Sequence, residues 1–288
     1  MGPGTLGVAA SQVNLLVNTW LATGEAGAVS ALTYAFRLMY MPIGIFSVSV
    51  ATAAIPELAR HAVNSDYGQM RSTVSWALRL MLMLSVPATV GLMVLSAPIV
   101  ELIYARGEFG TESVQLVSGA LLFYAPGIIG YSVVKIVSPT FYSLQDARTP
   151  MTASLITIAV NLALNLWLNA IMGFRGLALG TAIAANVNAG LLLWWLSRRI
   201  DGVETRRVLW SFTKILLASL VMAAAAYWTE IWLRDLVEGT AIPALLGRAI
   251  RVFGAIGTGI GTLALAAWTL GIEEFQQAMS RVVKRVLR

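Results

Sequence analysis

Eight stretches of the sequence are apolar over a length that can cross a lipid bilayer, and this feature limits the fold more than any other. They fall at about residues 3–22, 29–55, 72–97, 113–138, 151–170, 176–196, 210–229 and 247–270. A bilayer core needs roughly 20 apolar residues in one helix. Because an unpaired backbone amide in lipid is costly, such stretches form helices. We therefore predict an all-α integral membrane protein with about eight transmembrane helices.

The composition supports this class and excludes several functions. Of 288 residues, 58% are hydrophobic and 12% are charged, whereas soluble domains carry about 25% charged residues. The chain has no cysteine and one histidine, His61, which excludes disulfides and a multi-histidine metal site. It has no Walker A, HExxH or GxSxG motif. We therefore expect no catalytic residue, metal or cofactor, and no nucleic-acid partner, because anionic lipid headgroups account better for the net charge of +6.

The distribution of basic residues predicts the orientation. An even number of spans places both termini on one side of the membrane. The connecting segments on that side hold most of the basic residues: Arg60, Arg71, Arg148, Arg198, Arg199, Arg206, Arg207, Arg281, Lys284, Arg285 and Arg288. The opposite loops are expected to hold Arg106, Arg175, Arg234, Arg248 and Arg251. By the positive-inside rule, both termini are cytoplasmic, and residues 272–288 form a basic amphipathic helix on the membrane surface.

One cation lies inside a predicted span. Arg37 occurs in the apolar sequence TYAFRLMYMPIGIF, residues 33–46. A guanidinium at the centre of a span costs roughly 2.5–3.5 kcal/mol, so such residues face a protein-lined cavity and pair with an anionic group. We predict that Arg37 lines a binding cavity.

Polar residues on neighbouring spans are candidates for the same cavity. The first span carries Gln12, Asn14 and Asn18, and Asn14 and Asn18 share one helix face. They either form a polar cavity wall beside Arg37 or hydrogen-bond to adjacent helices for packing. Lys135, near the end of the fourth span, either lines the cavity or extends to the headgroups.

Other positions predict packing. Asn161 and Asn165 recur on one face of the fifth span and are expected to join helices. The pairs Gly176/Gly180 and Gly257/Gly261 have the spacing that permits close helix contact.

Arg79 is expected to extend its side chain to the membrane surface, and no carboxylate is expected within a span. Pro42, Pro87 and Pro126 are expected to kink their helices, either as moving hinges or as static breaks.

Five colinear segments resemble the MurJ/MviN family of bacterial lipid II flippases, within the multidrug/oligosaccharidyl-lipid/polysaccharide exporter (MOP) superfamily. They are SQVNLLVNTWLA (11–22), SALTYAFRLMYMPIGIFSVSVATAAIPELAR (30–60), PIVELIYARGEF (98–109), VVKIVSPTFYSLQDARTP (133–150) and GFRGLALGTAIAANVNAG (173–190). They resemble the family's seventh span onward.

The resemblance implies a carrier of lipid II, an undecaprenyl-pyrophosphate-linked glycan, in the bacterial cytoplasmic membrane. It implies a C-terminal six-helix lobe at 1–200, two further helices bordering a lipid groove at 201–271, and the cytoplasmic tail at 272–288. Arg37 would pair with the pyrophosphate, and Lys135 matches a family lysine. A first lobe is expected on a preceding segment or a separate chain. The alternatives are an exporter of another polyprenyl-linked oligosaccharide and a non-transporting fragment or scaffold.

Overall fold

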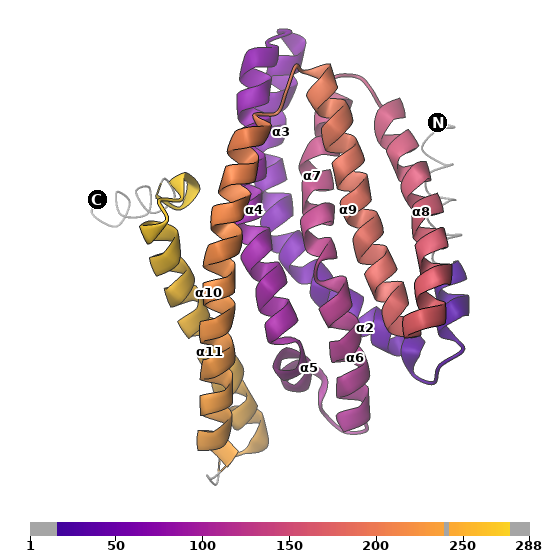
Figure 1. The fold of residues 1–288 in the computed structure, drawn as a ribbon, viewed down its shortest axis with the longest axis vertical. Coiled ribbons are helices and arrows are strands. Elements are labelled where there is room, and N and C mark those ends of the chain that lie inside the picture. The colour runs from indigo at the N-terminus through magenta and orange to yellow at the C-terminus, as the bar shows by residue number, and fades with distance from the viewer. Residues whose placement is uncertain (1–15, 239–241, 277–288) are drawn as a thin grey trace.

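The computed structural model describes residues 16–238 and 242–276, and this part of the chain is helical and contains no strand. Residues 16–22 are helical and precede the labelled elements. These are α2 (Ala28–Pro42), the π-helical turn η1 (Ile43–Ser47), α3 (Val48–Val63), α4 (Tyr67–Val94), α5 (Ser96–Tyr104), α6 (Thr111–Tyr124), α7 (Gly127–Ser143), α8 (Arg148–Met172), α9 (Phe174–Arg199), α10 (Thr205–Glu238) and α11 (Ala244–Thr269) (Figure 1).

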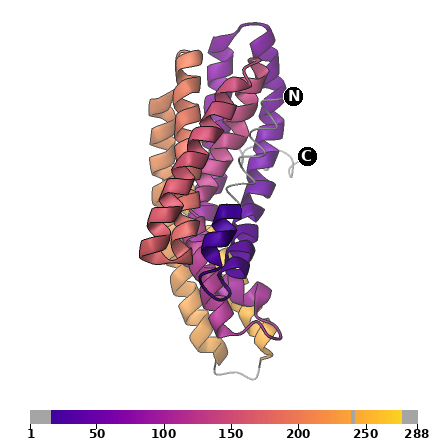
Figure 2. The ribbon, with the colours of Figure 1, turned by 90° about the vertical axis from the view of Figure 1, so that its right-hand side faces the viewer.

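The predicted membrane spans are confirmed wherever the structure describes them. Six described helices are long and apolar enough to cross a bilayer, or seven if the bent pair α6 and α7 counts as one span. Most of the first predicted span lies outside the described residues. The long helices α4 and α8 to α11 run roughly along the long axis of the molecule, whereas α2 is oblique to it (Figures 1 and 2), and such a parallel arrangement is expected of a membrane bundle.

Two large hydrophobic clusters form the interior of the lobe, and a small third one lies where α10 and α11 meet Leu95. Of the two large clusters, one includes Leu38 of α2 and Leu121 of α6, and the other includes Leu58 of α3 and Ile136 of α7. The long helix α9 contributes to both clusters. Along the chain, the transition between clusters coincides with two helix breaks, the η1 turn and the bend of 48° between α6 and α7. The two clusters are therefore connected by the continuous helix α9 as well as by these two breaks.

One end of the bundle carries a cluster of arginines. At the end where α7 and α9 finish and α8 and α10 begin, which lies at the top of Figure 1, the described basic residues are Arg60, Arg71, Arg148, Arg198, Arg199, Arg206 and Arg207. Arg71 fixes this arrangement by donating two hydrogen bonds to the carbonyl of Ile200, at 3.0 and 3.3 Å. We call it the basic end.

Helices α10 and α11 form a hairpin at one side of the lobe (Figure 1). Helix α10 packs along α4, while α11 packs along α10 and reaches α5 near the end opposite the basic end. The hairpin is therefore attached to the lobe chiefly through one of its two helices.

Small residues allow close helix contact at only some of the predicted places. The contact predicted at Gly176 and Gly180 is confirmed, because an added Cβ would lie within 3.0 Å of atoms of α8. The contact predicted at Gly257 and Gly261 is wrong, because an added Cβ at either position meets nothing within 4 Å. The spacing is the same in both pairs, but these α11 glycines face open space.

Candidate functional site

Arg37 lies on the exposed face of α2. The helix buries Ala35, Leu38 and Met39 and packs mainly against α6, which leaves Arg37 on the outer side. Burial raises the pKa of the Tyr104 hydroxyl at the end of α5, and the nearby charge of Arg37 lowers it in part. Within the described residues, no carboxylate forms an ion pair with Arg37. The part of the chain that the structure describes therefore leaves this cation without a neutralising anion.

Aromatic contacts connect the Arg37 surface to the half-buried Lys135. The rings of Tyr40 and Tyr131 lie 6.1 Å apart, and Phe36 contacts Tyr131 at 6.4 Å. Arg37 precedes Tyr40 by one helical turn, and Lys135 follows Tyr131 by one turn, so each cation shares a helix face with a contacting ring. We call the surface formed by Arg37, Tyr40, Tyr131 and Lys135 the cationic face. Like Arg37, Lys135 has no ion-pair partner among the described residues.

The remaining predicted site residues belong to the first span. Asn18 accepts a hydrogen bond of 2.5 Å from the side chain of Asn165 on α8, and Asn165 also donates to Asn161 at 3.0 Å. The interhelical packing predicted for Asn165 is confirmed, and Asn18 takes part in it. Whether Asn18 also binds a ligand stays a prediction. Gln12 and Asn14 lie outside the described residues.

Irregular backbone borders the cationic face. The π turn η1 follows Pro42, and a buried hydrogen bond of 2.6 Å joins Ser47 in this turn to Ser132 of α7. Such single π turns often mark functional sites in helices. Pro126 stands at the bend between α6 and α7, whereas Pro87 lies within the continuous helix α4. Whether these breaks move stays a prediction.

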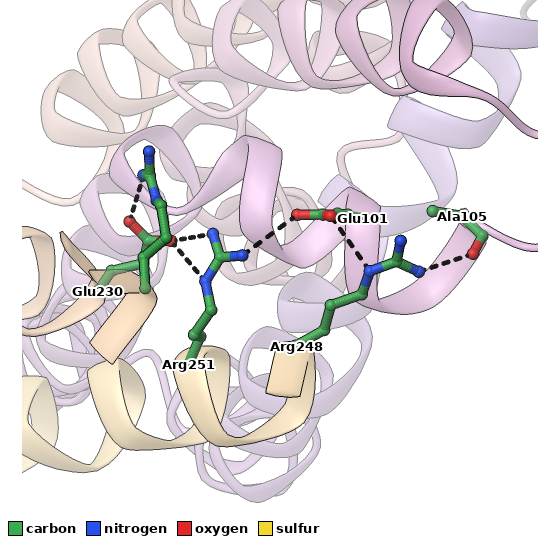
Figure 3. Close-up of polar contacts among 6 residues, drawn as sticks. Glu101, Ala105, Glu230, Arg248 and Arg251 are labelled. Carbon is green, nitrogen blue, oxygen red and sulfur yellow. Dashed lines mark hydrogen bonds and ion pairs between the residues drawn. The ribbon is translucent and has the colours of Figure 1, made fainter. Parts of the chain in front are cut away.

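Figure 3 shows an ion network that sequence reasoning missed. Glu230 of α10, with a side chain only 3% exposed, pairs with Arg234 at 2.7 Å and with Arg251 of α11. Glu101 of α5 pairs with Arg248 at 3.1 Å and lies 3.9 Å from Arg251. The network therefore connects the α10–α11 hairpin to the lobe.

The helix bounds and this network correct two expectations. Four arginines expected in loops lie on helices instead: Arg175 on α9, Arg234 on α10, and Arg248 and Arg251 on α11. Glu230 is a buried carboxylate within a candidate span. The spans continue beyond their apolar stretches because opposite charges on facing helices neutralise one another. The spacing of Glu230 and Arg234, four residues apart, is the signal that was available in the sequence.

A second buried pair attaches the other end of the hairpin. Arg79 of α4 is 8% exposed and pairs with Glu274 at 2.7 Å and with Glu273 at 3.2 Å, just beyond α11. The expectation that Arg79 extends to the membrane surface is therefore wrong. Its partners are distant in sequence, and only the return of α11 toward α4 brings them close.

The fold defines the class of protein. The chain matches a transporter of the MOP superfamily from Pyrococcus furiosus with a TM-score of 0.60 at 17% identity, over 98% of this chain and 66% of that one. It matches a solved structure titled "Lipid II flippase MurJ, inward closed conformation" with a TM-score of 0.72 at 25% identity, over 92% of this chain and 53% of that one. The architecture is therefore that of a MOP-type transporter lobe.

Sequence comparison identifies the family. The family model described as lipid II flippase MurJ matches residues 1–247. A probable lipid II flippase MurJ from Vibrio cholerae serotype O1 is 32% identical over 94% of this chain, and one from Rhizobium meliloti is 33% identical over 89%. The chain belongs to the MurJ lipid II flippase family. It spans about half the length of these two curated relatives, 51% and 49% respectively.

Proposed function

We propose that the chain forms the C-terminal lobe of a bacterial lipid II flippase, a transporter rather than an enzyme. The observation that carries the proposal is Arg37, an exposed cation on an apolar span whose charge no described carboxylate neutralises. A pyrophosphate would neutralise it, because a guanidinium offers paired donors to phosphate oxygens. Lys135, across the aromatic contacts, adds a second positive charge to the same surface.

The rest of the cavity is proposed to come from a first lobe. The relatives are about twice as long as the matched region, and a carrier that alternates access needs two bodies around one site. Residues 1–200 would form the second lobe, facing the first across the cationic face. The first lobe would belong to the same polypeptide or to a separate chain.

The hairpin is proposed to hold the prenyl tail of the substrate. Residues 201–271 would form this groove unit, and residues 272–288 a tail on the membrane surface. Exposed apolar side chains along α11 support the assignment: Phe253, Ile260, Leu265 and Trp268. The open space at Gly257 and Gly261 would admit a hydrocarbon chain close to the backbone.

The proposed location is the cytoplasmic membrane, with both termini in the cytoplasm. The clustering of arginines at the basic end supports this orientation, because cytoplasmic loops carry an excess of Lys and Arg. The two helix breaks support alternating access, since irregular backbone between packed units is where hinges form.

Binding of lipid II to the chain in nanodiscs tests the proposal. Replacing Arg37 with Gln removes charge-assisted hydrogen bonds worth about 1.5–3 kcal/mol, so the affinity should fall roughly 10- to 100-fold. Arg60→Gln is the matched control, because Arg60 is exposed on α3, on the same span, but pairs with Glu57. Equal affinity of the wild type and the Arg37 variant would contradict the proposal.

Two further measurements separate the alternatives. Stronger binding of another polyprenyl-pyrophosphate oligosaccharide than of lipid II would favour a different export substrate. In cells depleted of their own lipid II flippase, the chain fused behind the first half of the Vibrio cholerae relative should restore growth. Absence of both lipid II binding and growth would favour the scaffold alternative.

A further inference from the structure

A cavity of about 390 Å³ opens at the basic end, between the end of α7, the start of α8 and the end of α9. Arg148, Arg198 and Arg199 line it, together with the apolar surfaces of Phe141 and Trp195. It is separated in the fold from the cationic face, which lies along α2 and the middle of α7. The cavity thus combines positive charge with an apolar wall.

The arginines of this cavity are available to a ligand. The guanidinium groups of Arg148 and Arg199 are exposed and donate no hydrogen bond within the described part of the chain. Arg198 is held over the ring of Trp194, with its guanidinium carbon 4.1 Å from the ring centroid. Such stacking fixes the guanidinium in place and leaves its edge free for an anion.

One carboxylate in the lining already has partners. Asp146 accepts hydrogen bonds from the hydroxyl and the amide of Thr149, at 2.6 and 3.0 Å, and from the amide of Arg148 at 3.1 Å. The bond from the Thr149 hydroxyl helps to hold the pKa of Asp146 below its ordinary value. Asp146 therefore stays charged at neutral pH; its hydrogen bonds go to the start of α8, and its charge also attracts Arg199. Three arginines against one carboxylate leave the cavity with an excess of positive charge.

We propose that this cavity binds the phosphate headgroup of an anionic phospholipid such as phosphatidylglycerol. Helices α8 and α9 are both candidate spans. The start of α8 and the end of α9, which border the cavity, therefore lie at the headgroup layer of a bilayer. The arginines would pair with the phosphodiester, and Phe141 and Trp195 would contact the glycerol and the first acyl carbons. Basic pockets between transmembrane helices on the cytoplasmic side recognise lipid headgroups in this way. The inference does not depend on transport of lipid II.

The test measures binding of dioctanoyl phosphatidylglycerol to the detergent-purified full chain by native mass spectrometry. The double variant Arg148→Gln/Arg199→Gln should bind about 30-fold more weakly, since each basic residue at the headgroup layer contributes about a factor of five. The matched control is Arg106→Gln/Arg175→Gln, which removes the same charge from exposed positions away from the cavity and should bind as the wild type does. Equal losses in both variants would overturn the proposal.

Three further binding measurements identify the source of the phosphate and exclude misfolding as the cause of weaker binding. Dioctanoyl phosphatidylcholine, which has the phosphodiester without net charge, should bind more weakly than phosphatidylglycerol. Free glycerol 1-phosphate should not displace the lipid, and displacement at equal concentration would show a site for soluble phosphate instead. Thr152→Glu adds a negative charge at an exposed lining position and should also weaken binding. Unchanged binding in this variant would contradict the proposal even if the arginine variant failed to fold.

Discussion

Replacing Glu230 with Gln should destabilise the protein strongly, because it removes the negative charge at the centre of the hairpin network. The Glu230 side chain is 3% exposed, and its partners Arg234 and Arg251 are 44% and 14% exposed. Breaking a buried ion pair by removing one partner costs about 3–5 kcal/mol. Arg234 regains hydration and Arg251 keeps Glu101 at 3.9 Å, so we expect about 3 kcal/mol. For a chain of this size the melting temperature should fall by roughly 6–12 °C.

Thermal unfolding of the purified chain in detergent measures this effect. Glu57→Gln is the matched control, because the same substitution there breaks an exposed pair in which Arg60 and Glu57 are 64% and 53% exposed. Exposed pairs contribute about 0–1 kcal/mol, so the control should lower the melting temperature by about 4 °C at most. Adding Arg251→Gln to Glu230→Gln should cost less than the sum of the single changes. Equal shifts for Glu230→Gln and Glu57→Gln would refute the reasoning.

Two other predictions concern packing and pH. Gly130→Ala should destabilise the protein by about 1–3 kcal/mol or more, because the added Cβ would lie 2.5 Å from the Ala185 backbone. Gly190→Ala, with nothing within 4 Å, should be neutral or stabilising by up to about 1 kcal/mol, and thermal unfolding compares the two. Asp146→Ala should cost about 1 kcal/mol at pH 7, because it removes the carboxylate that accepts hydrogen bonds from the first amides of α8. Because the folded pKa of Asp146 is lowered, its contribution is present above about pH 4 and is lost as the pH falls through the folded value. The difference in melting temperature between wild type and variant should therefore shrink as the pH falls below about 4, and a constant difference would exclude this linkage.

The sequence predicted the features that depend on local composition. Apolar stretches of spanning length become helices in any arrangement, because lipid offers the backbone no other hydrogen-bond partner. The structure places Arg37 on the exposed face of α2, and whether it lines a binding cavity stays a prediction. The resemblance in five segments identified the family, and the family model and relatives agree with it.

The sequence was least informative about charges that meet across the fold. Arg79 and Glu274 are far apart in the chain, as are Glu101 and Arg248, and neither pair has a local pattern that predicts it. Spacing alone also did not distinguish Gly176 and Gly180, which contact α8, from Gly257 and Gly261, which face open space.

The sequence by itself determined that the chain is a helical membrane protein with a cation inside one span. Both features depend on each segment alone, because its apolar side chains favour lipid and its backbone hydrogen bonds are formed within the same helix. Only the tertiary structure decided which charges are neutralised. Arg79 pairs with Glu274, and Arg251 approaches Glu101, only because α11 packs near the lobe. Arg37, by contrast, pairs with no described carboxylate. The energy of an ion pair depends on distance and burial, and both are set by helix packing rather than by position in the sequence.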